Sequence, residues 1–255
     1  MKIISYNVNG IRSALSKGLL NFMQGSEGDV FCFQETKAMQ NQVEPFLFET
    51  IGFTHHHWFS AEKKGYSGVA IYSKAKPDNI VYGFGNPEWD NEGRMVRADF
   101  GDISVISVYM PSGSSGEDRQ AYKMHWLSFF NDFISELKKT RPNLVICGDY
   151  NICHKAIDIH DPVGNKNSSG FLPDEREWMQ QFIDSGFTDS FRSLYPGPHN
   201  YSWWSYRANA RANNKGWRID YCMVANPIAN RIEDAGILPL AMHSDHCPVW
   251  VKLKA

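Results

Sequence analysis

Short runs of β-branched and aromatic residues recur from one end of the chain to the other, and few architectures accommodate so many strands in 255 residues. Each run has a strand-like composition and a length of about five to seven residues. The predicted strands are Lys2–Tyr6, Asp29–Phe33, Gly68–Tyr72, Met95–Phe100, Ile103–Tyr109, Asn143–Cys147, Ile219–Val224 and Val249–Leu253. Because strands occur in both halves of the chain and outnumber helices, we expect two packed sheets with helices outside them.

Two other segments have the periodicity of helices. Between residues 117 and 139, apolar side chains recur every three or four positions, which is typical of an amphipathic helix. A second helix is predicted from Pro173 to Ser185, since proline is favoured at the first helical position and Gly186 follows as a stop. No segment has the composition of a linker, so we expect residues 1–255 to form a single domain.

Composition limits the classes of function. The formal net charge of −2 argues against a protein that coats nucleic acid regardless of sequence, but it allows an enzyme with one basic face and an acidic metal site. The five cysteines show no CxxC spacing and are expected to be reduced thiols. Neither a signal peptide nor an apolar run of about 18 residues occurs, so we expect a cytoplasmic protein that does not enter a membrane.

Polar residues follow or precede several predicted strands. They are Asn7, Asn9, Glu35, Tyr109, Asp149, Asn151, Asp220, Asp245 and His246. Side chains that leave the same end of several strands converge on one mouth of a sheet pair, where active sites are usually built. The sequence therefore predicts one polar site at that end.

The residue types in this set suit one kind of reaction. Hard oxygen ligands such as those of Glu35, Asp245 and Asn9 favour Mg²⁺, with Mn²⁺ as a substitute. His246 beside Asp220 is interpreted as an oriented imidazole, either a base or a stabiliser of developing charge. Neither a GxSxG motif nor a phosphate-binding glycine loop occurs, so direct attack by water is favoured over a covalent intermediate.

Six short motifs occur in a fixed order along the chain. They are Asn7-Val8-Asn9-Gly10-Ile11-Arg12, Gln34-Glu35-Thr36-Lys37, Gly65-Tyr66-Ser67-Gly68, Gly148-Asp149-Tyr150-Asn151, Gly216-Trp217-Arg218-Ile219-Asp220-Tyr221 and Ser244-Asp245-His246. Together they resemble the exonuclease III family of AP endonucleases, and the resemblance covers essentially the whole chain. It implies a four-layered αββα sandwich, as in pancreatic-type deoxyribonuclease, with two mostly antiparallel sheets flanked by helices.

The same resemblance implies an activity in DNA repair. The expected reaction is hydrolysis of the phosphodiester 5′ to an abasic site in duplex DNA, leaving a 3′-hydroxyl. Removal of 3′-phosphates and other 3′ blocks, and 3′→5′ exonuclease action, are expected as side activities. The expected partner is therefore double-stranded DNA with abasic sites or blocked 3′ ends, bound by a monomer.

Roles for individual residues also follow from the resemblance. Glu35, Asp245 and Asn9 are expected to hold the metal, while Asp220 and His246 form a catalytic dyad. Asp149 is expected either to activate the water or to protonate the leaving oxygen. A further group, Asn7, Tyr109 and Asn151, is expected to surround the phosphate.

Two positions depart from the pattern of some relatives. Some members have Asp where this chain has Asn9. The loop after Tyr109 reads Ser112-Gly113-Ser114-Ser115-Gly116 and lacks the arginine that vertebrate members insert into DNA, so weaker product retention is expected.

The segment from Tyr201 to Asp220 mixes basic with aromatic residues. Arg207, Arg211, Lys215 and Arg218 occur in one segment with Trp203, Trp204, Tyr206 and Trp217, which suits a loop that grips phosphates and encloses an extruded sugar. A solvated basic loop over an aromatic cluster is the alternative. The resemblance implies DNA-binding roles for Arg12, Tyr66, Asn165, Gly170, Trp203, Arg207, Trp217 and Ile219.

Within that set, the resemblance implies different roles for individual residues. Trp203, Trp217 and Ile219 are expected to line the pocket for the abasic sugar, with Arg207 as a wedge beside it. The small Gly170 favours cutting at true abasic sites, although a simple turn glycine explains it equally well.

Other functions remain open at this point. The same sandwich supports inositol-lipid phosphatases and sphingomyelinases, but these favour exposed aliphatic loops over alternating arginine and tryptophan. An enzyme that chiefly processes 3′ ends is the main alternative. A DNA-damage binder without catalysis is disfavoured, because such a protein is expected to have lost at least one of Glu35, Asp149, Asp220 and His246.

Overall fold

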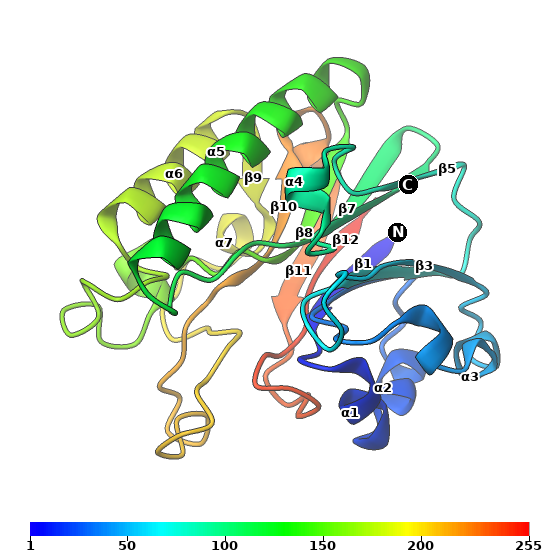
Figure 1. Cartoon of the computed structure of the whole chain (residues 1–255), viewed down its shortest axis with the longest axis horizontal. Helices are drawn as coiled ribbons and strands as arrows, with labels where there is room; N and C mark the ends of the chain where they lie inside the picture. Colours follow the sequence, from blue (N-terminus) through cyan, green and yellow to red (C-terminus); the bar gives the residue numbers. More distant parts are fainter. Residues whose placement is uncertain (255) are drawn as a thin grey trace.

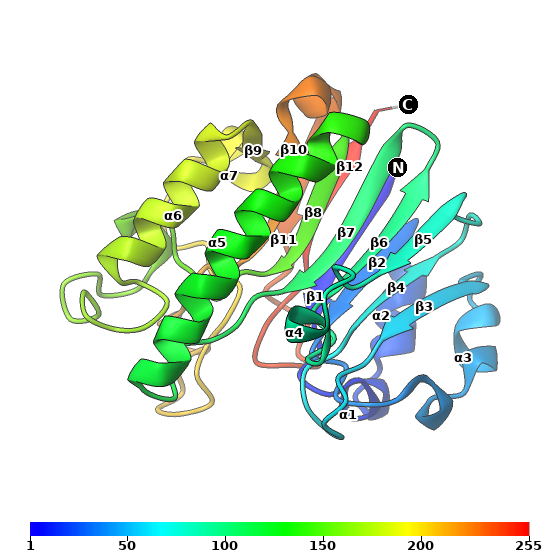
Figure 2. The same cartoon turned by 45° about the horizontal axis from the view of Figure 1, so that its top comes forward.

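Two six-stranded sheets lie face to face, and helices cover the outer face of each (Figure 1, Figure 2). This arrangement is taken from a computed structural model that describes residues 1–254. The first sheet contains, in spatial order, β11 (Ile232–Ile237), β12 (Val249–Leu253), β1 (Lys2–Asn7), β2 (Val30–Gln34), β4 (Val69–Ser73) and β3 (His55–Phe59). The second contains β5 (Asn79–Tyr82), β6 (Met95–Phe100), β7 (Ile103–Tyr109), β8 (Leu144–Asp149), β10 (Asp220–Ala225) and β9 (Phe187–Asp189).

Helices flank the two sheets. The α-helices are α1 (Ile11–Ser16), α2 (Leu19–Gly25), α3 (Pro45–Glu49), α4 (Pro87–Asp90), α5 (Glu117–Thr140), α6 (Pro173–Asp184) and α7 (Ser190–Leu194), and short 3₁₀ turns are η1 (Gln40–Gln42), η2 (Ala156–Asp158) and η3 (Asn226–Arg231). Figure 2 shows α5 and α6 along one outer face, with α1, α2 and α3 on the opposite side. The predicted four-layered αββα sandwich is confirmed.

Both sheets repeat one pairing pattern, in which a single parallel pair is flanked by antiparallel pairs. The parallel pairs are β1 with β2 and β7 with β8, and the other eight pairings are antiparallel. The strands of a parallel pair end at the same edge of the sheet. Asn7 lies opposite Gln34, and Tyr109 lies opposite Asp149, at those ends. The topology thus brings several predicted site residues to one edge.

The core has three layers of apolar contacts. Between the sheets lie small and β-branched residues such as Cys32, Val105 and Val145, whereas the large rings of Trp126 and Phe182 fill the space under α5 and α6. The third layer packs α1, α2 and α3 against the first sheet. Burial of each such side chain contributes about 1.5–3 kcal/mol to the free energy of unfolding. All five cysteines are buried free thiols, as expected.

The eight predicted strands and both predicted helices are present, with ends shifted by at most two residues. Four further strands, β3, β5, β9 and β11, lie outside the eight predicted ranges. The sequence of β3 contains three consecutive histidines, and the other three strands are short or carry charged residues and glycine. Among residues 1–254, none of the helices is long and apolar enough to cross a lipid bilayer.

Candidate active site

A cavity of about 350 Å³ opens where the predicted site residues gather. In Figure 1 the loops of residues 200–216 and 238–246 extend together below the sheets, beside the ends of β1 and β8. Nine predicted residues line the cavity: Glu35, Tyr109, Asp149, Asn151, Trp203, Trp217, Ile219, Asp245 and His246. Ser112, Ser114 and Ser169 also line it, and the sequence reasoning did not select them.

Asn7 lies behind the cavity, fully buried between the two sheets. Its Nδ2 donates to Glu35 Oε1 at 2.8 Å and to Asp149 Oδ2 at 2.9 Å. Its Oδ1 accepts from the backbone N–H of Asn9 at 3.0 Å, which satisfies the other end of the amide. One buried amide therefore sets the separation of two carboxylates that come from different sheets.

His246 and Asp220 form the expected dyad. The Nδ1 of His246 lies 2.9 Å from Asp220 Oδ2, and its Nε2 points toward Asp149 Oδ2 at 3.8 Å. Asp220 is fixed in turn by Ser202, whose hydroxyl donates to Asp220 Oδ2 at 2.6 Å and accepts from the N–H of Asp220 at 3.1 Å. An imidazole held in this way has a defined orientation toward the cavity. A serine in a loop carries no sequence feature that reveals this contact.

The site is crowded with carboxylates, and the pKa values reflect it. Burial is the largest influence on Asp149 and raises its pKa to about 7, with Asp220 and Glu35 acting in the same direction and His246 against them. Burial disfavours the imidazolium of His246, but Asp220 and Asp149 outweigh it and raise the pKa of His246 to about 10. Burial also raises the pKa of Tyr109 well above its usual range, so the phenol remains a hydrogen-bond donor.

The carboxylates leave room for a cation. Ligand atoms of Glu35, Asp149 and His246 all lie within 4.8 Å of one another, a spacing that one metal ion can bridge. The hard oxygens of this set match Mg²⁺ or Mn²⁺. A bound cation would also offset the repulsion that raises the pKa of Asp149.

Two other predicted metal ligands lie beside this group and are held by neighbours. Asp245 accepts from Asn9 Nδ2 at 2.9 Å and from Trp203 Nε1 at 3.0 Å. Burial would raise its pKa, yet the charge of His246 and these hydrogen bonds lower it. The Oδ1 of Asn9 accepts from Lys37 Nζ at 2.5 Å, and Lys37 also pairs with Glu35 at 2.8 Å. Lys37 thus supplies a cation at this edge, a role that its position in the sequence does not reveal.

An apolar pocket adjoins the carboxylates. The rings of Trp203 and Trp217 meet edge to face with centroids 5.9 Å apart, and both pack against the buried Ile219. Gly170 closes one side, since a Cβ at this position would lie 2.9 Å from Trp217 Cζ3 and 3.2 Å from Asn151 O, and its φ is +95°. Gly170 is therefore more than a turn glycine, because a larger residue would press on the pocket wall.

Not all the basic residues of the 201–220 segment face solvent, and the expectation that they grip phosphates is wrong for two of them. Arg211 donates to the carbonyls of Ser244 at 2.9 Å, Pro239 at 2.8 Å and Ala241 at 2.6 Å. Arg218 is buried and binds Asp158 Oδ1 at 2.7 Å. Both guanidinium groups therefore donate to carbonyl or carboxylate oxygens of the protein itself.

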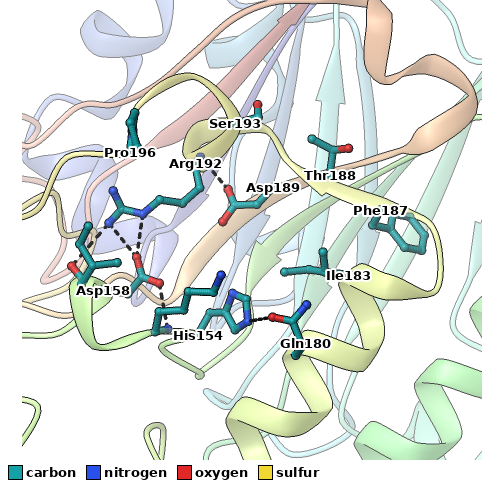
Figure 3. A pocket seen from close by; sticks show the side chains of 12 residues that line it. His154, Asp158, Gln180, Ile183, Phe187, Thr188, Asp189, Arg192, Ser193 and Pro196 are labelled. Atoms are coloured by element: carbon teal, nitrogen blue, oxygen red, sulfur yellow. Dashed lines mark hydrogen bonds and ion pairs between the residues drawn. The ribbon is translucent and has the colours of Figure 1, made fainter.

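The partner of Arg218 lies in a second cavity of about 520 Å³, which Figure 3 shows. There Asp158 also accepts from Arg192 Nη2 at 2.7 Å, while His154 lies 2.9 Å from Gln180 (Figure 3). These polar side chains form hydrogen bonds and ion pairs with one another. They affect the active site only through Arg218. Because Arg218 lies between Trp217 and Ile219 in the chain, its bond to Asp158 holds both pocket residues in place.

The remaining predicted DNA-binding residues lie outside the cavity. Arg12, on α1, and Arg207 have exposed side chains, with no hydrogen-bond or ion-pair partner among residues 1–254. Tyr66 donates to Glu92 at 3.1 Å and accepts from Arg119 at 2.8 Å. Asn165 donates to the carbonyls of its own turn, including that of His160 at 3.1 Å.

Several known proteins are similar to this chain. An exodeoxyribonuclease of Bacillus subtilis (strain 168) is 43% identical over 251 residues, which cover 98% of each chain. An AP endonuclease from Archaeoglobus fulgidus has a structure with a TM-score of 0.90 and 31% identity, and all of both chains is covered. A 3′ phosphatase from Neisseria, solved with a product DNA hairpin, gives a TM-score of 0.91 and 28% identity with the same coverage.

Fold, site and relatives together define a phosphodiesterase of the nuclease class. Residues 4–246 match the Endonuclease/Exonuclease/phosphatase family, and the chain belongs to that family.

Proposed function

We propose that this protein is a DNA-repair AP endonuclease, which hydrolyses the phosphodiester 5′ to an abasic site in duplex DNA and leaves a 3′-hydroxyl. The observation that carries the proposal is the pocket of Trp203, Trp217 and Ile219 next to the buried carboxylates. An apolar pocket of this kind accepts a deoxyribose without its base and excludes a larger flipped nucleotide. The carboxylates line the same cavity, so a metal ion held by them would contact the phosphate that adjoins the sugar.

The residues of the site support metal-assisted hydrolysis with Mg²⁺, for which Mn²⁺ would substitute. Glu35 would hold the ion, with Asp149 in reach and Asp245 and Asn9 beside it, whereas the protonated His246 would not be a ligand. When bound, the metal would neutralise charge on the phosphate and on the leaving oxygen. This set adds Asp149 to the expected Glu35, Asp245 and Asn9, and Lys37, which contacts both Asn9 and Glu35, would have to move when the ion binds.

The protein groups would then orient the phosphate and move the proton. Asp149, with a pKa near 7, suits proton exchange at neutral pH with either the attacking water or the leaving oxygen. His246, cationic and held by Asp220, would stabilise the charge that builds on the phosphoryl oxygens. Tyr109 lines the same cavity and can donate to those oxygens, whereas Asn151 Nδ2 already donates to the carbonyl of Met110 at 2.9 Å and has one proton left for this role.

The main alternative is an enzyme that chiefly removes phosphates and nucleotides from 3′ ends. It is favoured by the similarity to the Neisseria 3′ phosphatase and needs the same carboxylates. The width of the sugar pocket distinguishes the two functions. A binder without catalysis is disfavoured, because Glu35, Asp149, Asp220 and His246 are all present and in contact range.

We further propose that the chain acts as a monomer with one catalytic domain. Support comes from the origin of the site, since Asn7 belongs to the first sheet and Asp149 to the second. Neither sheet holds a complete site alone, and no residue from another chain is needed to complete the set. Exposed Arg12 and Arg207 are left to contact the duplex outside the cavity.

The proposal is tested with a labelled duplex that contains one tetrahydrofuran abasic analogue, with Mg²⁺ or with EDTA. This analogue cannot react by β-elimination, so a cut 5′ to it must be hydrolysis. We expect metal-dependent incision that Asp149→Asn reduces by at least about 10²-fold. An intact duplex and a nick with a 3′-phosphate are run beside it. Loss of the 3′-phosphate without incision of the analogue would support the alternative.

A further inference from the structure

A lysine and a glutamate form a buried ion pair beneath the sugar pocket. Lys123 lies on α5 and Glu175 on α6, and neither side chain has more than 1% of its surface exposed. Their Nζ and Oε1 atoms are 2.5 Å apart. Lysine and glutamate are rarely buried in proteins, and the helical pattern of α5 predicts no such role for Lys123. Neither residue lines the cavity that holds the carboxylates.

Lys123 also holds the backbone of the site. Its Nζ donates to the carbonyl of Asn151 at 2.9 Å. Asn151 is in the left-handed region at φ +52°, a conformation that costs free energy and persists only because surrounding contacts hold it. The same residue donates from its N–H to Asp149 Oδ1 at 2.8 Å. Lys123 therefore fixes the turn that follows β8, directly after the carboxylate proposed to exchange a proton.

Glu175 holds the opposite side of the pocket. Its Oε2 accepts from the N–H of Gly170 at 2.6 Å and from the N–H of Leu172 at 2.9 Å. The second bond is the usual contact of a glutamate at the third helical position with the residue before the helix. The first bond goes further, because it reaches Gly170, the residue packed against Trp217.

The ion pair thus joins the two walls from below, in addition to the backbone bond from the N–H of Cys153 to the carbonyl of Gly170 at 2.7 Å, and Gln120 Nε2 also donates to Glu175 at 3.0 Å. Asn151 and Gly170 are neighbours, since a Cβ on Gly170 would lie 3.2 Å from Asn151 O. Lys123 binds that same carbonyl, and Glu175 binds the amide of Gly170. A change in the length of the pair would move both walls toward or away from Trp217.

Stability alone is a poor explanation for this pair. Removing two charges from water costs several kcal/mol, and apolar residues of similar volume often serve as well or better. What apolar residues cannot supply is a donor for Asn151 and an acceptor for Gly170. We propose that Lys123 and Glu175 are positioning residues that set the width of the sugar pocket and so favour abasic sites over 3′ ends. This inference rests on the proposed function and adds the element that sets its specificity.

The test is the double variant Lys123→Met/Glu175→Met, which removes both charges together and leaves no unpaired buried ion. Values of kcat/KM are measured on one preparation for incision at tetrahydrofuran and for removal of a 3′-phosphate. We expect the ratio of the two to fall by about tenfold or more, mainly through KM for the abasic duplex, because small displacements of positioning groups are costly. A purely structural role would lower both activities in proportion, and an unchanged ratio would overturn the inference.

A matched control uses the exposed pair Lys139 and Glu136 on the same helix, 2.7 Å apart. The variant Lys139→Met/Glu136→Met makes the same chemical change at the surface, and we expect it to leave the ratio unchanged. An equal fall in this control would also overturn the inference.

Hydrogen exchange on the unaltered protein keeps the test independent of whether the double variant folds. The amides of Gly170 and Leu172 should be protected far more than that of Asn167 in the same loop, because Glu175 accepts from both. Equal exchange at the three amides would contradict the inference. Wild-type protein that removes the 3′-phosphate but leaves tetrahydrofuran intact would instead contradict the proposed function, whatever the exchange result.

Discussion

The side-chain amide of Asn7 donates to Asp149 Oδ2 at 2.9 Å and thereby joins the two sheets at the active site. Asn7 ends β1 of the first sheet, and Asp149 ends β8 of the second. The amide keeps one oxygen of Asp149 directed toward the cavity floor while Glu35 accepts its other proton. The geometry of catalysis therefore depends on how the sheets are packed, as well as on the loops.

Replacing Asn7 should impair turnover more than folding. We expect Asn7→Ala to lower kcat for incision of the abasic analogue by about 10²-fold, because Asp149 and Glu35 lose the group that separates them. Steady-state kinetics checks the value. The matched control is Asn79→Ala on the edge strand β5, because this variant removes an amide that binds Asp99 at 3.1 Å, away from the cavity. Equal kinetics for Asn7→Ala and wild type would contradict the role.

The charge on His246 should depend on Asp220. Because the pKa of His246 is about 10, the imidazole should stay protonated at pH 8 in metal-free protein. We expect Asp220→Asn to lower that pKa by at least about one pH unit, since it removes the nearest negative charge. Imidazole NMR shifts across pH measure the change.

The same pair should contribute to stability in one pH range. A raised pKa stabilises the folded state fully below the ordinary value of 6.5, and the effect is lost as pH rises through about 10. The stability difference between wild type and Asp220→Asn should therefore shrink as the pH increases toward 10. A stability difference that grows over this pH range would contradict a raised pKa for His246.

Two arginines of the 201–220 segment should behave in different ways. Arg207 is exposed, so Arg207→Met should weaken binding to the abasic duplex and lower the slope of log K against log salt by about one, with unchanged Tm. Arg211 binds the carbonyls of Ala241 and Ser244, so Arg211→Met should lower the free energy of unfolding by about 1–3 kcal/mol. Calorimetry measures Tm and the free energy of unfolding of each variant, and salt titrations measure the slope of log K against log salt. The reverse pattern would mean that Arg211 is the DNA contact.

Gly170 should tolerate no side chain. In Gly170→Ala the new Cβ meets Trp217 at 2.9 Å in a left-handed backbone, and we expect abasic incision to fall about tenfold. Removal of a 3′-phosphate should fall less. Gly197→Ala is the control, because a Cβ there has nothing within 4 Å. Wild-type incision by Gly170→Ala would refute the assignment of this wall.

Metal should stabilise the protein through Glu35. At a hundredfold excess over its Kd, Mg²⁺ should raise the free energy of unfolding by about 2.7 kcal/mol, and EDTA should reverse the effect. Thermal unfolding of wild type and Glu35→Gln measures the difference. We expect Glu35→Gln to lose most of the increase, whereas the exposed control Glu136→Gln should keep it. An undiminished increase in Glu35→Gln would place the metal elsewhere.

The sequence was sufficient to predict the parts of the site that follow strands. Asn7, Glu35, Asp149 and Asp220 are adjacent to apolar runs, and the direction of a strand determines where its end residue lies. The strands themselves were predicted because alternating and continuous apolar runs are local features.

Long-range contacts were not predictable in this way. Arg211 and Arg218 have the composition of a DNA-binding loop, but only the folded chain shows that backbone carbonyls and Asp158 are their partners. Likewise, Lys123 and Glu175 are separated by 52 residues and resemble ordinary surface charges of two helices. Their function depends on burial, which the local sequence does not specify.

The most direct measurement of the central claim is to cut the tetrahydrofuran duplex in H₂¹⁸O and to analyse both fragments by mass spectrometry. Attack by water on the phosphorus, 5′ to the abasic sugar, predicts an upstream fragment that ends in a 3′-hydroxyl. It also predicts one ¹⁸O in the 5′-phosphate of the downstream fragment. A 3′-phosphate on the upstream fragment, or a 5′-phosphate without ¹⁸O, would contradict the account.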